Sequence, residues 1–152
     1  SVTDAVITNL STGDIYWTSK EKGAFLNDKP ISVHKEKPLY KIVGINSSGT
    51  SPELLKRLSP IYEKHHHVRH FGANALEMAM LAEGLIDIFI DLRKKIRIQD
   101  LAGGYLLVKE AGGLILDENL QSLDSDLNYD TRLSFVAAAN KNILDEIFSL
   151  IK

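Results

Sequence analysis

The sequence predicts a layered α/β domain in which helices flank a central mixed, mostly parallel sheet, preceded by short antiparallel hairpins. Three observations predict this fold class. Beyond residue 40, short apolar segments rich in β-branched residues alternate with helical segments of about ten residues, the order that builds a central sheet between helices. Before residue 34, turn sequences separate shorter apolar segments. The chain has 152 residues, 44% hydrophobic and 25% charged, which is enough for one compact core.

The first 33 residues are expected to form hairpins. Aromatic and β-branched residues alternate there with Gly, Asn, Asp and Pro turn sequences, a pattern typical of short paired strands. The expected strands are residues 5–10, 15–18, 23–26 and 31–33, with turns at residues 11–14 and 27–30. We therefore divide the chain into residues 1–33, the hairpins, and residues 34–152, the α/β part.

The remaining elements alternate between strands and helices. A Lys-Glu-Lys-Pro sequence at residues 35–38 interrupts the pattern before a buried strand at residues 40–45. Ser51 followed by Pro52 favours a helix start, and the Ser-Pro pair at residues 59–60 predicts a pause in that helix. Further strands are expected at residues 68–71, 86–92, 114–116 and 133–139, further helices at residues 73–82, 100–111 and 141–151, and a polar loop at residues 117–132. Gly84 and Gly112 are expected to end the first two of these helices, and Asn140 to cap the last.

Composition and charge exclude several classes of function. With 18 Lys and Arg residues against 20 Asp and Glu residues, the formal charge is −2, so no overall field attracts nucleic acid or an anionic membrane. Cysteine is absent, which excludes disulfides, zinc–thiolate sites and a thiol nucleophile. No apolar run approaches the roughly 20 residues that cross a bilayer, and the chain does not start like a signal peptide. We expect a soluble, cytoplasmic protein that binds neither nucleic acid nor membrane.

Several common motifs are missing or incomplete. The phosphate loop of nucleotide hydrolases, the Gly-x-Gly-x-x-Gly fingerprint and the Gly-x-Ser-x-Gly elbow do not occur. Residues 124–130 resemble the start of a calcium loop, but Tyr129 and Phe135 stand where Gly and Glu are needed, so we expect a solvated acidic loop. The three consecutive histidines at residues 65–67 point in different directions and are expected on the surface, whereas the role of His70 stays open.

Asp100 is the strongest candidate for a metal ligand. It is expected to end a strand-like stretch and to open a helix whose first turns carry Ala102, Gly103 and Gly104, so that a cation could sit beside closely approaching backbone. The alternative is an ordinary helix N-cap, because an Asp there accepts a hydrogen bond from the exposed amides of the first turn. The two roles are compatible, since one carboxylate oxygen can cap while the other binds metal.

Three further segments carry candidate binding groups. Residues 69–75 join a strand end to a buried helix, where free amides could hold a phosphate or substrate oxygen; the alternative is a simple connection. Ser47 follows the strand at residues 40–45, and ligands of open α/β sheets lie beyond the carboxyl ends of strands; the alternative is a turn residue. Residues 91–97 carry four cations after Asp91, and the planar fork of an Arg such as Arg93 fits a phosphate group; the alternative is a solvated basic loop.

The segment Ile-Gln-Asp-Leu-Ala-Gly-Gly-Tyr-Leu-Leu-Val-Lys-Glu-Ala-Gly-Gly, residues 98–113, resembles the carboxy-terminal signature of the inositol monophosphatase family of magnesium-dependent sugar-phosphate phosphatases. Gln99 stands where that signature usually has Trp. Gly-Ala-Phe-Leu-Asn at residues 23–27 and Val-Ala-Ala-Ala-Asn at residues 136–140 extend the resemblance over residues 19–152. The basic stretch is similar to that of archaeal-type members that also hydrolyse fructose 1,6-bisphosphate.

The resemblance implies roles for individual residues. Asp100 would bind Mg²⁺. The substrate wall would be lined by Ser47, Arg69, Gly72, Ala73, Asp91 and Arg93. Ala73 replaces the Ser or Thr common at that position, so a hydroxyl contact would be lost while backbone contact survives.

The acidic motifs of the family's amino-terminal half are missing from this sequence. The resemblance therefore implies a carboxy-terminal part of a phosphatase, inactive alone because a single Asp cannot fix magnesium, which needs octahedral oxygen ligation. Residues 1–33 would extend a sheet of the missing half, and their unpaired edges predict either a homodimer or disorder near the amino terminus. The expected ligand is a sugar or inositol phosphate. The alternative function is a non-catalytic sugar-phosphate-binding or interaction module that keeps the fold.

Overall fold

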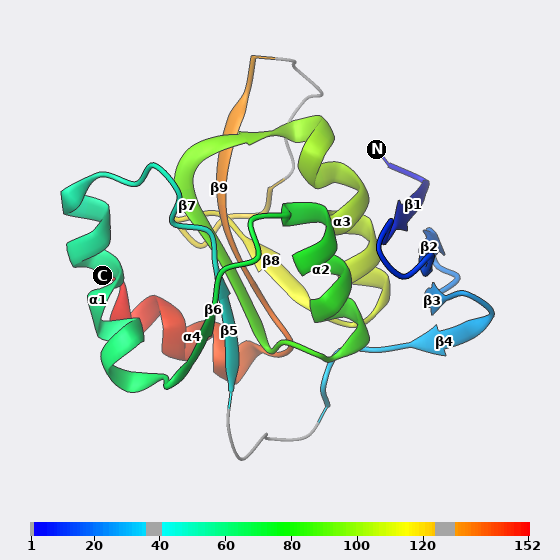
Figure 1. The fold of residues 1–152 in the computed structure, drawn as a ribbon, viewed down its shortest axis with the longest axis horizontal. Coiled ribbons are helices and arrows are strands. Elements are labelled where there is room, and N and C mark those ends of the chain that lie inside the picture. Colours follow the sequence, from blue (N-terminus) through cyan, green and yellow to red (C-terminus); the bar gives the residue numbers. More distant parts are fainter. Residues whose placement is uncertain (1, 36–40, 124–129) are drawn as a thin grey trace.

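The computed structural model describes residues 2–35, 41–123 and 130–152. Figure 1 shows its elements in successive layers: a small hairpin sheet, then the helices α2 and α3, then the central sheet, then the helices α1 and α4. The expected break at residues 36–38, the start of a strand at residue 40 and most of the acidic loop, residues 124–129, lie outside the described residues.

The hairpin sheet is antiparallel and joins β1 (Asp4–Thr8), β2 (Ile15–Ser19), β3 (Ala24–Leu26) and β4 (Lys29–Ile31) in this order. Its inner face, with Ala5, Tyr16 and Ala24, is buried against α3. The last strand begins two residues earlier than expected because the turn is short. Asn27 adopts a positive φ of 52°, and its side-chain oxygen accepts the Ile15 amide at 3.0 Å, which suits a tight turn.

The central sheet is mixed, as the sequence predicts. Its strand order is β6 (His67–Arg69), β5 (Ile42–Ile45), β7 (Ile88–Arg97), β9 (Arg132–Ala138) and β8 (Leu114–Leu116). β5 pairs in parallel with β6 and β7, whereas β9 pairs antiparallel with β7 and β8, so the two kinds of pairing are equal in number. The carboxyl ends of β5 and β6 consequently meet at one edge of the sheet.

The helices are α1 (Pro52–Lys64), α2 (Asn74–Glu83), α3 (Ile98–Glu110) and α4 (Lys141–Leu150). Ser51 caps α1 by accepting the Leu54 amide at 3.2 Å, and Asn140 caps α4 by accepting the Ile143 amide at 3.0 Å. Gly84 ends α2 in the left-handed conformation, with φ 82°. None of the helices in the described ranges is long and apolar enough to cross a membrane.

The predicted pause in α1 is wrong, because the helix runs through Pro60. Proline has no N–H and leaves the carbonyl four residues earlier, that of Lys56, without its usual partner. The Ser59 hydroxyl donates to this carbonyl at 2.9 Å and so replaces the missing bond. At the end of the same helix, the expectation of surface histidines is wrong for His65, which is buried with 8% exposure.

The structure also corrects the basic stretch and the start of α3. β7 continues to Arg97 instead of ending at a loop, and residues 92–95 bulge out opposite Ser134 alone, with Lys94 at a positive φ of 55°. α3 begins at Ile98, so Arg97 is its N-cap residue and Asp100 lies inside the first turn. Asp100 is therefore not the N-cap.

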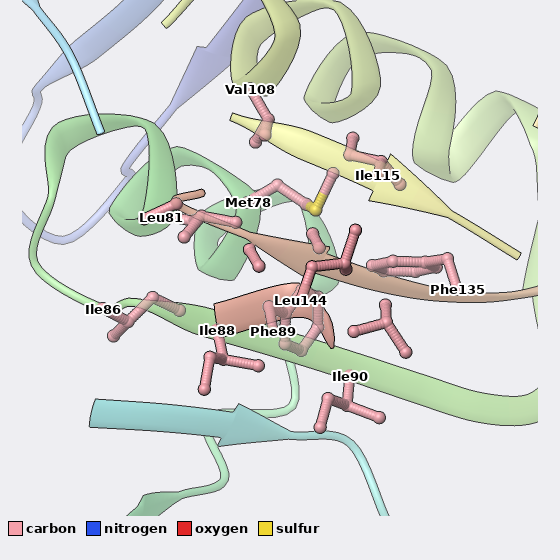
Figure 2. Close-up of a cluster of buried hydrophobic side chains, with 14 of the residues drawn as sticks. Met78, Leu81, Ile86, Ile88, Phe89, Ile90, Val108, Ile115, Phe135 and Leu144 are labelled. Carbon is pink, nitrogen blue, oxygen red and sulfur yellow. The ribbon is translucent and has the colours of Figure 1, made fainter. Parts of the chain in front are cut away.

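The core lies on both faces of the central sheet (Figure 2). Met78 and Leu81 of α2 cover one face, and Leu144 of α4 approaches from the other side. Phe89 and Phe135, neighbours on β7 and β9, are fully buried and meet edge to face with centroids 5.4 Å apart. Each such side chain contributes about 1.5–3 kcal/mol by burial, which fixes the strands whose ends form the site.

Candidate active site

A hollow of about 750 Å³ lies where the carboxyl ends of β5 and β6 meet the amino-terminal turns of α2 and α3. The β7 bulge and strand β1 close its sides. Its lining consists of Val6, Ile7, Asn46, Ser48, His70, Gly72, Ala73, Asn74, Ala75, Arg93, Lys95, Ile96, Gln99, Asp100, Gly103 and Gly104. The predicted residues Gly72, Ala73, Arg93 and Asp100, from distant parts of the sequence, thus line the same hollow.

Asp100 presents its carboxylate to this hollow, and 43% of the side chain is exposed. Its two oxygens accept hydrogen bonds from Arg97, at 2.7 Å from Nε and 3.1 Å from Nη2. The pair is surface-exposed and therefore weak, so a competing cation can displace the guanidinium at small cost. The carboxylate is accessible for metal ligation.

Asp91 lies behind the residues that line the hollow and does not line it itself. It is fully buried and absent from the lining. Its oxygens accept from the Arg93 guanidinium at 2.7 and 2.9 Å and from the Asn74 amide at 3.2 Å, while Asn46 donates to Asn74 at 2.7 Å. The hydrogen bond to Asp91 raises the pKa of the Arg93 guanidinium, and burial partly offsets this rise. Asp91 therefore orients Arg93 and Asn74, which themselves reach the hollow.

One amide at the start of α2 is already taken by a side chain of the same helix, contrary to expectation. Glu77, fully buried one turn into α2, accepts the Ala73 amide at 3.2 Å through Oε2, whereas its Oε1 has no hydrogen-bond partner among the described residues. Burial raises the pKa of the Glu77 carboxyl, and the neighbouring backbone amides partly oppose this rise. The Glu77 carboxyl group thus occupies the Ala73 amide, one of the groups that sequence reasoning assigned to a ligand.

Ser47 and Arg69 lie beside the hollow, outside its lining. The Ser47 amide approaches the Nδ1 atom of His70 at 3.4 Å, and the same nitrogen lies 2.9 Å from the Ile45 carbonyl. Arg69 is exposed and donates to the neighbouring Val68 carbonyl at 3.0 Å. Of Ser47, Arg69 and His70, only His70 lines the hollow, where its ring lies between the ends of β5 and β6.

The bulge in β7 and the loop after β5 are tied together by two cations. Arg93 Nη1 donates to the Ser48 carbonyl at 3.0 Å, and Lys95 Nζ donates to the Gly49 carbonyl at 2.8 Å. Both carbonyls are neutral, so the charge of Lys95 is not cancelled by this contact. Lys95 thus adds a positive charge to the lining that also carries Asp100, and this charge suits an anionic ligand.

Comparisons with known proteins bear on this site. The model of the inositol monophosphatase family matches residues 2–152. The chain belongs to this family. A fructose-1,6-bisphosphatase/inositol-1-monophosphatase of Methanothermobacter thermautotrophicus is 37% identical over 147 residues, which are 96% of this chain and 51% of the relative. A bifunctional NADP phosphatase/NAD kinase of Methanococcus maripaludis is 35% identical over 88% of this chain and 24% of its own length.

Solved structures agree with the family assignment. An inositol monophosphatase-fructose 1,6 bisphosphatase superposes with a TM-score of 0.86 and 36% identity over 97% of this chain and 57% of the solved chain. A hypothetical protein from Pyrococcus horikoshii with similarities for inositol-1 monophosphatase gives a TM-score of 0.87 and 27% identity over 99% of this chain and 57% of its own. This inositol monophosphatase family chain thus spans about half the length of the curated relatives that carry the bisphosphatase/monophosphatase name.

The family assignment raises the question whether the described residues can hold a metal ion. Among the described residues, no group of three or more His, Asp and Glu side chains could hold an ion. Asp100 offers one carboxylate, whereas Mg²⁺ demands six oxygen ligands in near-octahedral geometry. The described residues therefore fit one position of such a site and do not form a complete one.

Sequence reasoning missed several residues of this hollow. Asn46, Asn74, Lys95 and Gln99 line the hollow, and Glu77 supports it from below. Asn46 could have been found, because it follows the buried strand directly as Ser47 does. Glu77 had only one signal, an acidic residue in an otherwise apolar helix.

Proposed function

We propose that this chain is the carboxy-terminal part of a magnesium-dependent sugar-phosphate phosphatase of the fructose-1,6-bisphosphatase/inositol-1-monophosphatase type. The observation that carries the proposal is that Asp100, the turn at Gly72 and Arg93 line the same hollow. Relatives with that name match over almost the whole chain. Residues 1–33, in this proposal, extend a sheet of polypeptide that carries the remaining metal ligands.

In the proposed reaction, bound magnesium would lower the pKa of a water molecule and neutralise charge on the phosphoryl group. Asp100, whose carboxylate is bonded by Arg97 in this structure, would supply one ligand to the ion. Arg93, oriented by buried Asp91, and Lys95 attract the anionic substrate and hold its charged groups. His70, Asn46 and Asn74 offer hydrogen-bonding groups to sugar hydroxyls along the same wall.

The test begins with the purified chain. It is mixed with Mg²⁺ and with inositol monophosphate, fructose 1,6-bisphosphate or 3′-phosphoadenosine 5′-phosphate, and released phosphate is measured. We expect no release, because one carboxylate cannot fix the ion. Magnesium-dependent release by the chain alone would overturn the predicted inactivity of the fragment.

The second arm uses a longer protein that joins this chain to the family's acidic motifs. Asp100→Asn should abolish most activity there, and Arg93→Ala should lower kcat/KM for the bisphosphate at least tenfold, as loss of a charge-assisted contact of roughly 1.5–3 kcal/mol predicts. Lys109→Ala, at an exposed position away from the hollow, is the control. Unchanged bisphosphate turnover in the Arg93 variant would contradict the proposed role of the basic stretch in binding the bisphosphate.

A non-catalytic module that binds sugar phosphates is the second candidate. It is favoured by the missing metal cluster among the described residues. Tight sugar-phosphate binding by the longer protein without any turnover would support it. A small-molecule phosphate as ligand, a homodimer and a cytoplasmic location remain predictions of the sequence.

A further inference from the structure

Two side-chain amides in the lining of the candidate active site, those of Asn46 and Asn74, have a fixed orientation. Asp91 is buried and paired with Arg93, so it is a carboxylate and only accepts hydrogen bonds. Asn74 must therefore present its NH2 group to Asp91, at 3.2 Å, and its oxygen to Asn46. Asn46 must in turn present its NH2 group to Asn74, at 2.7 Å. We call this arrangement the amide network.

The amide network begins with an acceptor that requires a donor. Its orientation assigns Oδ1 to the end of Asn46 that does not bond Asn74. This oxygen is buried and has no hydrogen-bond partner within the described ranges. Asn46 is 5% exposed, so a polar atom left in this state is costly and a donor nearby would stabilise it.

The buried carboxyl of Glu77 lies at the same contact between α2 and β5. Its Oε1 atom is also buried and without a partner in the described part of the chain. A Cβ atom at Gly44 of β5 would lie 3.4 Å from this oxygen, so Oε1 faces the strand. Asn46 projects from the same face of the strand two residues further on, because the ladder continues with the bond from the Asn46 amide to the Ile90 carbonyl at 2.9 Å. Asn74, the partner of Asn46, precedes Glu77 by three residues and shares its helix face.

One proton supplies the donor that both oxygens lack. A carboxylic acid donates one hydrogen bond and still accepts, so a proton on Oε1 leaves Oε2 free to accept the Ala73 amide. Burial also favours the neutral acid, because it raises the pKa of the Glu77 carboxyl. Charge on His70, after β6, opposes this rise to a smaller extent, and Arg93 on β7 is already paired with Asp91.

We propose that Glu77 is a positioning residue of the candidate active site. As a carboxylic acid it donates from Oε1 to Asn46 Oδ1, directly or through one water molecule, and thereby holds the amides of Asn46 and Asn74 in the lining. Each amide uses one N–H inside the network and keeps a second, so the pair offers donors to oxygen atoms of a ligand. The consequence for substrate binding rests on the proposed phosphatase function, whereas the network itself does not.

The first test is an NMR titration of the chain. Carbon-detected spectra follow the carboxyl group of Glu77, and we expect it to stay protonated above about pH 4.3, where an exposed Glu is half ionised. When Glu77 ionises, the side-chain NH2 signals of Asn46 and Asn74 should shift with the same midpoint, and those of exposed Asn142 should not. A midpoint of Glu77 near pH 4.3, or Asn46 signals that do not respond to it, would overturn the inference.

Substitutions separate the proton from the packing of the side chain. Glu77→Gln mimics the neutral acid, because its carboxamide both accepts the Ala73 amide and donates to Asn46. Glu77→Met keeps the length of the side chain but provides neither bond. At about pH 5, the side-chain signals of Asn46 and Asn74 should stay in place in the Gln variant and move in the Met variant. Leu81→Met, at another buried position of α2, is the control. If Glu77→Met does not fold, the titration of the unchanged chain decides.

The longer protein of the proposed function reports on the substrate. Glu77→Met should raise KM for fructose 1,6-bisphosphate about fivefold with little change in kcat, as the loss of one neutral hydrogen bond in substrate binding predicts. Glu77→Gln should rescue this KM. Equal KM values in both variants would overturn the positioning role. No turnover by the unchanged longer protein would instead contradict the phosphatase function, and the titration of the chain would then decide the network alone.

Discussion

The contact between α2 and α3 depends on Gly104. A Cβ atom at this position would lie 2.8 Å from Met78 Cβ and 2.9 Å from Met78 Cγ, and Met78 is 1% exposed. At the preceding Gly103, a Cβ atom would meet only Ala5 Cβ, at an ordinary 3.6 Å. The two neighbouring glycines of one helix therefore form a matched pair for Gly→Ala substitution.

The two variants should change stability in opposite directions. Alanine in place of glycine inside a helix gains up to about 1 kcal/mol, because the unfolded chain loses less entropy on folding. Gly103→Ala should keep this gain. Gly104→Ala has the same gain but overpacks the helix contact, which costs about 1–3 kcal/mol. The difference between the variants, about 1–3 kcal/mol, isolates the clash because the propensity term is common to both.

Urea unfolding of the chain measures this difference. We expect the Gly103→Ala midpoint above and the Gly104→Ala midpoint below that of the unchanged chain. A gap of about 2 kcal/mol corresponds to roughly 4–8 °C in Tm for a chain of this size. Equal stability of the two variants, or a more stable Gly104→Ala, would refute the argument that a close helix approach requires glycine there.

Three further predictions concern buried or capping polar groups. Asp91→Asn should lower the free energy of unfolding in urea by about 3 kcal/mol, because it breaks a buried ion pair. Asp145→Asn, at an exposed pair, should lower it by less than about 0.5 kcal/mol. Similar losses in the two variants would contradict the argument from burial. The raised pKa of Glu77 in the folded chain stabilises the protein at low pH, and this stability is lost as the carboxyl group ionises. Glu77→Gln lacks this loss, so it should become more stable relative to the unchanged chain as pH rises above about 4.3. A stability difference that does not change with pH would argue against this. Asn140→Ala should cost about 1 kcal/mol through the lost cap of α4, whereas Asn142→Ala, at an exposed position in the first turn, should cost close to nothing. The reverse order would contradict the capping role of Asn140.

Most of the elements were predictable from local patterns. Ser51-Pro52, Gly84 and Asn140 mark helix ends in the structure as in the sequence, since caps depend on the residue and its immediate neighbours. The failures arose where a distant or compensating contact intervened. α1 continues through Pro60 because a side-chain hydroxyl replaces the lost backbone bond, and β7 extends through the basic stretch because β9 pairs with it beyond the bulge.

The candidate site shows the same division. The sequence pointed to Gly72, Ala73, Arg93 and Asp100, because short motifs at strand ends and helix starts carry their own signal. It could not reveal that Asp91 is buried under Arg93, because whether an acidic side chain faces solvent or a cation depends on the packing around it.

Local sequence is thus sufficient for the kinds of elements, their approximate limits and the membership of the chain in a phosphatase family. The partners of the charged side chains depend on the folded arrangement. Lys95 bonds the Gly49 carbonyl and Asp91 bonds Asn74, because packing brings together groups that are far apart in the chain. Electrostatic interactions act through space at distances of a few ångströms, and no pattern along the backbone encodes those distances.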